Sequence, residues 1–275
     1  MKVLEYGKEK EKTLLFLPCT AEPEWAFTDA VTLLAQDHHV LQIVYDGHGG
    51  TVGEDFISVE RTVDEVTDWL HGHGINALDA AYGCSLGGAC LTRLLALGEL
   101  PVGRAIIDAG ITPYQLPLLA RGAICLADWA GFQLLAGNRR ILEMAYPPER
   151  WTLPGRDPVK EYDALEAYLK TYSSRSVRNI FWSANNYALP KKPAQTPCRI
   201  IYWYGDEEKK ARHGNIRFIK RYFPHARMRG IPKMEHAELV MLHPQEFYRR
   251  AMEFYTHTPC GKTAETQTEA QTETK

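Results

Sequence analysis

Apolar residues occur along this chain in two kinds of run, continuous and helically spaced. Short continuous runs bounded by turn residues are typical of strands, above all of strands buried on both faces of a parallel sheet. The segments predicted as strands are 2–6, 13–17, 40–45, 77–82, 103–107, 199–204 and 226–231. Apolar residues on one side of a helix occur at 25–35, 59–70, 86–97, 215–222 and 237–255. This alternation predicts an α/β fold with a doubly wound, mainly parallel sheet.

The alternation stops between 111 and 197, where no strand is predicted and helical patterns occur at 115–126, 129–146, 159–172 and 177–187. We therefore expect an α/β core formed by 1–110 and 198–257, with 111–197 inserted as an all-helical cap. Such an insertion should lie over the carboxyl ends of the strands, where open α/β sheets bind their ligands. The last segment, 258–275, is rich in Thr, Glu and Gln and is predicted to be a disordered tail.

The sequence Gly83-Cys84-Ser85-Leu86-Gly87 stands where a predicted strand passes directly into a predicted helix. A serine on so sharp a corner has a strained backbone, and residues larger than glycine two positions away would collide with the strand and the helix. The strain directs the hydroxyl out of the sheet, and the amide of Leu86 begins a helix whose positive end favours an oxyanion. Ser85 is therefore a candidate nucleophile for attack on a carbonyl carbon.

A nucleophilic serine needs a histidine as general base and an acid that orients the histidine. Both should come from loops that follow later strands, in the order serine, acid, histidine. Asp206 directly follows the strand at 199–204, and His236 follows the strand at 226–231. We expect these two residues to complete the site. The rival acids are Asp108, Glu207 and Glu208, and the rival histidines are His225 and His243.

An oxyanion hole needs a second backbone donor besides Leu86, from the loop after an early strand. That loop begins Pro18-Cys19-Thr20, and proline has no N–H, so the donor is Cys19 or Thr20. His48 lies in a glycine-rich loop on the same side of the predicted sheet. It either contacts the substrate or completes a turn.

Composition narrows the function classes. The net charge of the 275 residues is −2, so the chain lacks the electrostatic footprint of a nucleic-acid-binding protein. The six cysteines have no paired spacing and indicate buried thiols in a reducing cytoplasm, where we expect the protein to be located. The first twelve residues do not have the pattern of a signal peptide, and no membrane span is expected. Histidines and cysteines do not occur at metal-ligand spacing, so we expect neither a metal nor a cofactor.

With these residues in this order, the chain resembles the α/β-hydrolase family, in its serine-nucleophile branch with a helical cap. The resemblance extends to residue 257, with 83–87 as its most specific part. The roles that it implies are nucleophile for Ser85, base for His236, orienting acid for Asp206, and oxyanion donors for Leu86 with Cys19 or Thr20. The chain departs from the family at Pro18-Cys19, where many members have His-Gly, and at Glu235, where many have glycine.

The expected function is hydrolysis of a small or medium carboxylic ester, or a related acyl compound, through an acyl-enzyme. Hydrolysis of amides, thioesters or carbon–carbon bonds, and acyl transfer, use the same three residues and remain alternatives. A non-catalytic member that binds a small molecule is the alternative from another class. Among the aromatic residues of the insertion, we expect Trp129, Phe132 and Trp182 to contact the substrate.

Overall fold

Seven strands form one sheet in the computed structural model, which describes residues 1–49, 54–114 and 116–256. The strands are β1 (Lys2–Tyr6), β2 (Thr13–Leu17), β3 (His39–Val44), β4 (Leu78–Cys84), β5 (Val102–Asp108), β6 (Arg199–Gly205) and β7 (Arg227–Ile231). Their spatial order is β1-β3-β2-β4-β5-β6-β7, and each neighbouring pair is parallel except β1 and β3. The predicted mainly parallel sheet is therefore confirmed. The predicted tail, 258–275, lies outside the described residues.

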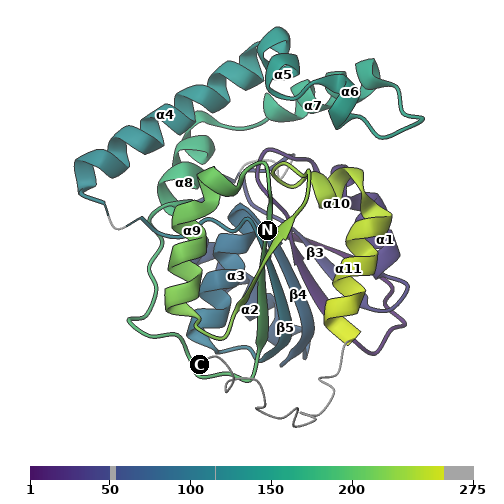
Figure 1. Cartoon of the computed structure of the whole chain (residues 1–275), viewed down its shortest axis with the longest axis vertical. Helices are drawn as coiled ribbons and strands as arrows, with labels where there is room; N and C mark the ends of the chain where they lie inside the picture. The colour runs from purple at the N-terminus through teal and green to yellow at the C-terminus, as the bar shows by residue number, and fades with distance from the viewer. Residues whose placement is uncertain (50–53, 115, 257–275) are drawn as a thin grey trace, which may run out of the picture.

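Helices cover both faces of the sheet, as a doubly wound fold requires (Figure 1). On one face lie α2 (Val59–Gly72), α3 (Leu86–Leu97) and α9 (Lys209–Tyr222). On the other lie α1 (Thr28–Leu34), α10 (Glu238–Leu242) and α11 (Pro244–Thr256), preceded by the short helix η1 (Glu24–Phe27).

The continuous apolar strands serve two hydrophobic cores at once. Successive side chains of a strand point to opposite faces of the sheet. Leu15 and Leu17 of β2 accordingly pack with α2 and α3, whereas Leu14 and Phe16 pack with α1 and α11. Because both faces are buried, the central strands carry apolar residues at consecutive positions instead of alternating ones.

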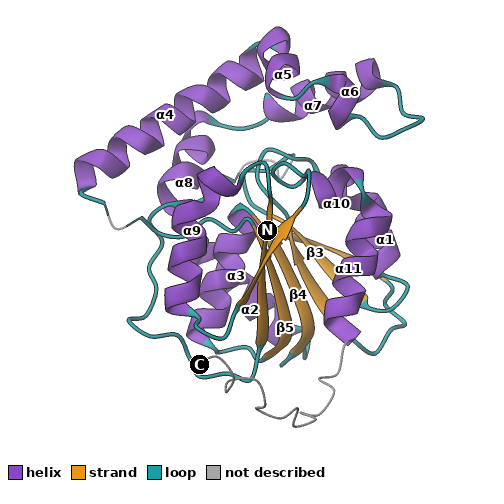
Figure 2. Ribbon diagram, in the orientation of Figure 1, coloured by secondary structure: helices purple, strands orange, loops and turns teal. Residues whose placement is uncertain are grey.

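The chain between β5 and β6 lies over the carboxyl ends of the strands (Figure 1). Its helices are α4 (Leu118–Gly137), α5 (Arg139–Ala145), α6 (Pro148–Trp151), α7 (Pro158–Leu169) and α8 (Ser174–Ala184). The described residues of this segment, which we call the cap, contain no strand (Figure 2). The cap's position places its inner surface opposite the loops that carry the predicted site.

Two breaks between consecutive helices differ from the sequence-based expectation. Helices were expected at 115–126 and 129–146, but α4 continues to Gly137 and a new helix begins where the side chain of Asn138 accepts hydrogen bonds from the amides of Arg140 and Ile141. A single helix was expected over 237–255, but α10 ends before His243 and a second helix follows. The next residue, Pro244, begins α11 because proline is favoured in a first helical turn and disfavoured inside a helix.

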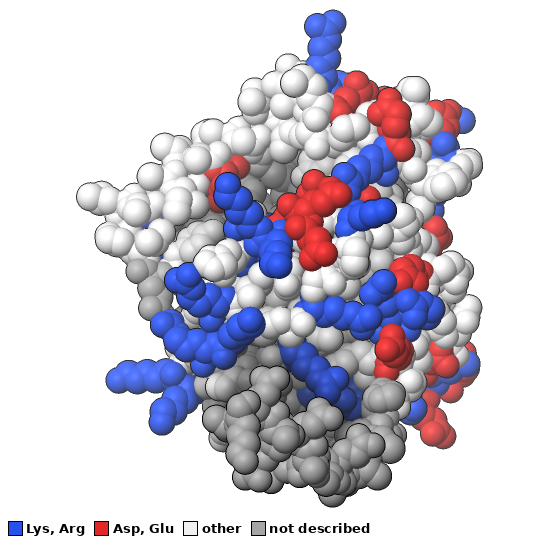
Figure 3. Space-filling view, in the orientation of Figure 1, with Lys and Arg blue, Asp and Glu red and all other residues white. Residues whose placement is uncertain are grey.

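Helix α4 is long and apolar enough to cross a membrane, by length and composition alone. Little of it is buried within the protein. Leu119 and Leu126 are exposed, and this part of the surface has few charged side chains (Figure 3). In the structure α4 belongs to the cap and packs against α8.

The described cysteines are all free and buried: Cys19, Cys84, Cys90, Cys125 and Cys198. Burial raises the pKa of the thiols of Cys90, Cys125 and Cys198, because a thiolate is poorly solvated inside the protein. These thiols are therefore held in the unreactive neutral form.

Candidate active site

Ser85 occupies a strained corner between β4, which ends at Cys84, and α3, which begins at Leu86. Its φ is +53° and its ψ is −110°, a combination that residues with a side chain rarely adopt. A Cβ atom at Gly83 would lie 2.4 Å from the carbonyl oxygen of Gly87, and one at Gly87 would lie 2.0 Å from the carbonyl oxygen of Leu17. The two glycines are thus required sterically, as the sequence pattern predicts.

The neighbouring strand holds this corner in place. The amide of Ser85 donates to the carbonyl oxygen of Asp108 (2.9 Å), and the amide of Ile111 donates to the carbonyl oxygen of Ser85 (3.2 Å). A Cβ at Gly88 would lie 2.4 Å from the Cα of Gly110, so the start of α3 and the end of β5 are in close contact. The strained conformation persists because the structure around it determines it from several sides.

His236 pairs with a buried carboxylate, that of Glu208. The Nδ1–H group of His236 donates to Oε2 of Glu208 over 2.9 Å, and Nε of Arg212 donates to the same oxygen over 2.7 Å. The amide of Gly205 donates to the other oxygen of this carboxylate. Burial favours the neutral carboxyl, but the hydrogen bonds and charges of His236 and Arg212 outweigh burial and lower the pKa of Glu208. A carboxylate held ionised in this way orients the imidazole ring.

Asp206, the acid expected from the sequence, does not occupy that place. Its side chain is exposed and lies beside β7, where a Cβ at Gly230 would come within 2.2 Å of Oδ1 of Asp206. The reason is the turn after β6. The amides of Asp206 and Glu207 donate to the carbonyl oxygens of Ile231 and Met234, and this arrangement places the third residue of the turn, Glu208, beside His236.

Asp108, another rival acid, is buried at the end of β5. The hydroxyl of Tyr82 donates to Oδ2 of Asp108 over 2.7 Å. Burial, with a smaller contribution from the charge of Glu208, raises the pKa of Asp108 to about 6, although the hydrogen bond from Tyr82 opposes the change. Asp108 therefore lies near the His236–Glu208 pair but has a different hydrogen-bond partner.

The predicted oxyanion loop follows β2. The hydroxyl of Tyr45 donates to the carbonyl oxygen of Pro18 (2.9 Å), and Oγ1 of Thr20 lies 2.9 Å from Nε2 of His48. Nδ1 of His48 lies 3.1 Å from the carbonyl oxygen of Asp46, which can only accept. Nδ1 therefore carries the proton, and Nε2 accepts from Thr20.

His48 therefore supports the loop that follows β2 from the protein interior. Its side chain is buried, and burial lowers its pKa to about 4, so the ring is neutral near pH 7. His48 holds Thr20 in position through the hydrogen bond between them.

Arg150 of α6 joins the cap to the core beside the site. Its guanidinium donates to both carboxylate oxygens of Glu238 (3.0 and 2.7 Å) and forms an ion pair of 3.0 Å with Glu207. Glu238 is only two residues after His236, and its Oε2 accepts from the amide of Glu235. One cap side chain therefore bridges both loops that carry the His236–Glu208 pair.

The aromatic residues expected to contact substrate are all in the cap. Trp129 and Trp182 line a groove between α4 and α8, together with Leu126, Arg178 and other residues of those helices. The indole N–H of Trp129 donates to Oγ of Ser174 across this groove. Phe132 is buried and packs against Tyr172, whose ring in turn contacts His48. Ser85 and His236 do not line the groove.

Two functional candidates did not emerge from the sequence. Glu208 was only a rival acid, because Asp206, Glu207 and Glu208 are consecutive and the choice depends on the path of the turn. Arg150 carried no signal at all, because its partners lie 57 and 88 residues further along the chain (207 − 150 and 238 − 150).

No family model matches the chain, and neither does any curated protein. Solved structures do. A putative α/β hydrolase family protein from Desulfitobacterium hafniense superimposes with a TM-score of 0.71 at 19% identity, covering 92% of this chain and 99% of that one. A structure from a study of carboxylesterases of the thaumarchaeon Nitrososphaera gargenis matches with a TM-score of 0.71 at 16% identity, covering 93% of each chain. An E-2-(acetamidomethylene)succinate hydrolase matches with a TM-score of 0.67 at 16% identity, covering 93% of this chain and 94% of that one. At such identities the likeness concerns the fold alone.

Proposed function

From the premise that this chain has the α/β-hydrolase fold, we propose that it is a serine hydrolase that cleaves a small or medium carboxylic ester or a related acyl compound. The observation that carries the proposal is the hydrogen bond between His236 and the buried, ionised carboxylate of Glu208. A histidine oriented in this way has one ring nitrogen left to accept a proton, which a serine nucleophile requires. Ser85 is that nucleophile, on the strained corner between β4 and α3.

The reaction proceeds in two halves. Nε2 of His236 takes the proton of the Ser85 hydroxyl as Oγ attacks the ester carbonyl carbon, and Glu208 stabilises the imidazolium that forms. The negative oxygen of the tetrahedral intermediate accepts hydrogen bonds from the amide of Leu86 and from the amide of Cys19 or Thr20. Collapse of the intermediate expels the alcohol, protonated by His236, and leaves an acyl group on Ser85. A water molecule, deprotonated by His236, then releases the acid.

Glu208 takes the role that the sequence suggested for Asp206. Thioesters and activated amides pass through the same intermediates, so they are the nearest alternatives to an ester. Acyl transfer differs only in the second nucleophile, which is an alcohol or amine in place of water.

A fluorophosphonate probe tests the proposal, because it phosphonylates only a serine that a neighbouring base activates. We expect one adduct per chain, on the peptide that contains Ser85, and none in Ser85→Ala. The matched control is Ser174→Ala, which removes an exposed cap serine and should label like the wild type. A folded wild-type protein that takes up no probe, and hydrolyses no ester, would overturn the proposal in favour of a non-catalytic binding protein.

A further inference from the structure

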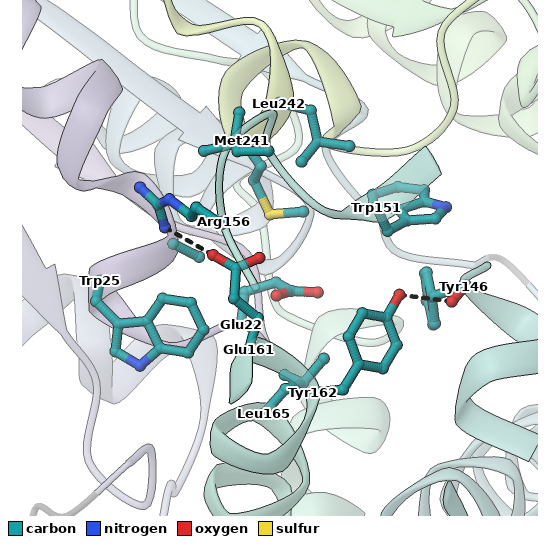
Figure 4. Close-up of a pocket in the computed structure, with 12 residues that line it drawn as sticks. Glu22, Trp25, Tyr146, Trp151, Arg156, Glu161, Tyr162, Leu165, Met241 and Leu242 are labelled. Atoms are coloured by element: carbon teal, nitrogen blue, oxygen red, sulfur yellow. Dashed lines mark hydrogen bonds and ion pairs between the residues drawn. The ribbon is translucent and has the colours of Figure 1, made fainter. Parts of the chain in front are cut away.

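A cavity lies between the core and the cap, next to the loops of the candidate site (Figure 4). The centre of a water molecule can occupy about 60 Å³ of this cavity, which opens to solvent on one side. Its chemically distinctive lining residues are Glu22, Trp25, Tyr146, Trp151, Tyr162 and Met241. Glu22 lies three residues after Cys19 of the oxyanion loop, and Met241 is on the helix that follows His236. The cavity therefore adjoins the site from the side of both loops.

The carboxylate of Glu22 points into this cavity without a partner. Figure 4 shows it near the middle of the lining residues, and among the described residues its side chain makes no hydrogen bond or ion pair. The other charged groups of the lining neutralise one another, because Arg156 pairs with Glu161 at 3.0 Å. Arg156 also pairs with Asp29, outside the cavity. Glu22 is thus a carboxyl group for which the described part of the chain supplies no cationic partner.

Aromatic rings surround the carboxylate. Trp25 comes from the core, whereas Tyr146, Trp151 and Tyr162 come from the cap (Figure 4). Tyr146 and Trp151 meet edge to face with centroids 5.1 Å apart, and the hydroxyl of Tyr162 donates to the carbonyl oxygen of Tyr146. These contacts fix the rings in place. Aromatic faces beside a carboxylate attract an organic cation, since the ring quadrupole and the charge act in the same direction.

We propose that this cavity binds the ammonium group of a cationic substrate, with Glu22 as its counter-ion and the rings of Trp25, Tyr146 and Trp151 as its walls. The inference rests on the proposed function for the reaction itself. It adds the substrate class: an ester or related acyl compound that carries a quaternary or protonated amine. Ser85 and His236 do not line the cavity, so the cationic end of the substrate lies apart from the scissile bond.

Proton linkage follows from the environment of Glu22. Burial raises its pKa to about 8, so a cation binds best after this carboxyl has lost its proton. The groups that face Glu22 from the packed elements are Tyr146, Tyr162, Tyr168, Tyr172, His48 and the Arg156–Glu161 ion pair, and Glu24 lines a neighbouring pocket with Glu22. Burial raises the pKa of each tyrosine and lowers that of His48 to about 4, so these groups keep one charge state near neutrality. Cation binding should therefore strengthen as the pH rises through about 8.

The first experiment measures binding without catalysis. Tetramethylammonium is titrated calorimetrically into the Ser85→Ala protein, alone and combined with Glu22→Gln or Glu99→Gln. Glu99 is exposed and lies in the turn before β5, at the end of the sheet opposite the cavity. Glu99→Gln therefore makes the same change of charge far from the cavity. We expect Glu22→Gln to weaken binding about tenfold and Glu99→Gln to leave it unchanged. Equal affinities in the three proteins, or no binding to any of them, would overturn the proposal.

The second experiment measures specificity. Choline butyrate is compared with its neutral isostere, in which carbon replaces the ammonium nitrogen, and nitrophenyl trimethylammoniobutyrate is compared with its own carbon isostere. We expect a preference in kcat/KM of about tenfold for the cation in at least one pair, rising between about pH 7 and about pH 9. Glu22→Gln should abolish both the preference and its pH dependence. A wild type that prefers the neutral member of both pairs would refute the cation site and leave the hydrolase intact. Cation binding without any ester hydrolysis would refute the hydrolase instead.

Discussion

At the scale of the residue, the site depends on which carboxylate orients His236. We expect Glu208→Gln to lower kcat by about 10³-fold or more, because an amide favours the wrong imidazole tautomer and cannot stabilise the imidazolium. Asp206→Asn should change kcat by less than about threefold, since the Asp206 side chain is exposed and lies beside β7. Steady-state hydrolysis of a nitrophenyl ester by the two variants measures the difference.

The two variants remove the same charge two residues apart in one turn, so each is the control for the other. A melting temperature for both is needed, because Glu208→Gln also takes the ionic partner from Arg212. If Asp206→Asn were the more damaged enzyme, the turn would have to rearrange when substrate binds, and Asp206 would return as the orienting acid.

The raised pKa of Asp108 should make the free energy of unfolding depend on pH. Its pKa is about 6 in the folded protein and about 3.9 in an unfolded chain, so between these values the folded state holds a proton that the unfolded state has lost. Stability from this group is present below about pH 4 and is lost as the pH rises to about 6, by about 3 kcal/mol. Asp108→Asn cannot ionise and should escape the loss.

The measurement is urea unfolding of wild type and Asp108→Asn at several pH values. We expect the free energy of unfolding of the variant to increase relative to that of the wild type from about pH 4 to about pH 6. This difference should persist at neutral pH. Asparagine can still accept the hydrogen bond from Tyr82 through its amide oxygen. If the difference in free energy of unfolding between the two proteins does not vary with pH, the pKa of Asp108 is not raised in the folded protein.

At the scale of the element, Arg150 makes the docking of α6 a determinant of substrate affinity. Arg150→Met keeps the apolar stem but removes the ion pairs to Glu238 and Glu207. We expect KM to rise about threefold to tenfold with a smaller effect on kcat, because a loosened cap disturbs the cavity more than the His236–Glu208 pair. The expected effect should be larger at low salt, where the wild-type ion pairs are strongest.

Arg139→Met is the matched control. Its guanidinium pairs with Glu143, Asp163 and Glu166 and lies over the ring of Tyr162, so all of these partners are within the cap. Steady-state kinetics and limited proteolysis of the cap should separate the two variants. Equal changes in KM would show that cap stability in general, and not the bridge to the core, determines affinity.

The elements also show what local sequence can predict. Strands were identified because burial on both faces requires apolar residues in succession, as in β2, where Leu14 to Leu17 divide between two cores. The strained corner at Ser85 was predicted because its steric requirements lie within five residues. Helix boundaries at Asn138 and Pro244 were missed, since competing helical periodicity continues through both positions. The pairing of His236 with Glu208 was not predicted, because three carboxylates follow β6 and a contact between the turn and the β7 loop decides which of them reaches His236.

At the scale of the whole molecule, the interface between cap and core depends on contacts between segments far apart in the chain. Glu22 of the N-terminal part, Trp151 of the cap and Met241 of the C-terminal part line one cavity, and Arg150 of the cap pairs with Glu238 of the C-terminal part. Local patterns carry no information on such pairings, so the cavity and the bridge could not be predicted from the sequence. The fold could be, because an alternation of strands and helices leaves few sheet topologies open.

Because the thiols are buried, their rates of chemical modification report local and global unfolding of the protein. Cys125 belongs to the cap, whereas Cys84, Cys90 and Cys198 belong to the core, and each can react with a disulfide reagent only while its surroundings are open. In a Cys260→Ser background, we expect Cys125 to be modified first and the core thiols to follow together, at the much slower rate of global unfolding. Mass spectrometry of peptides taken at intervals would give both rates. One common rate for all of these thiols would mean that cap and core open as a single cooperative unit.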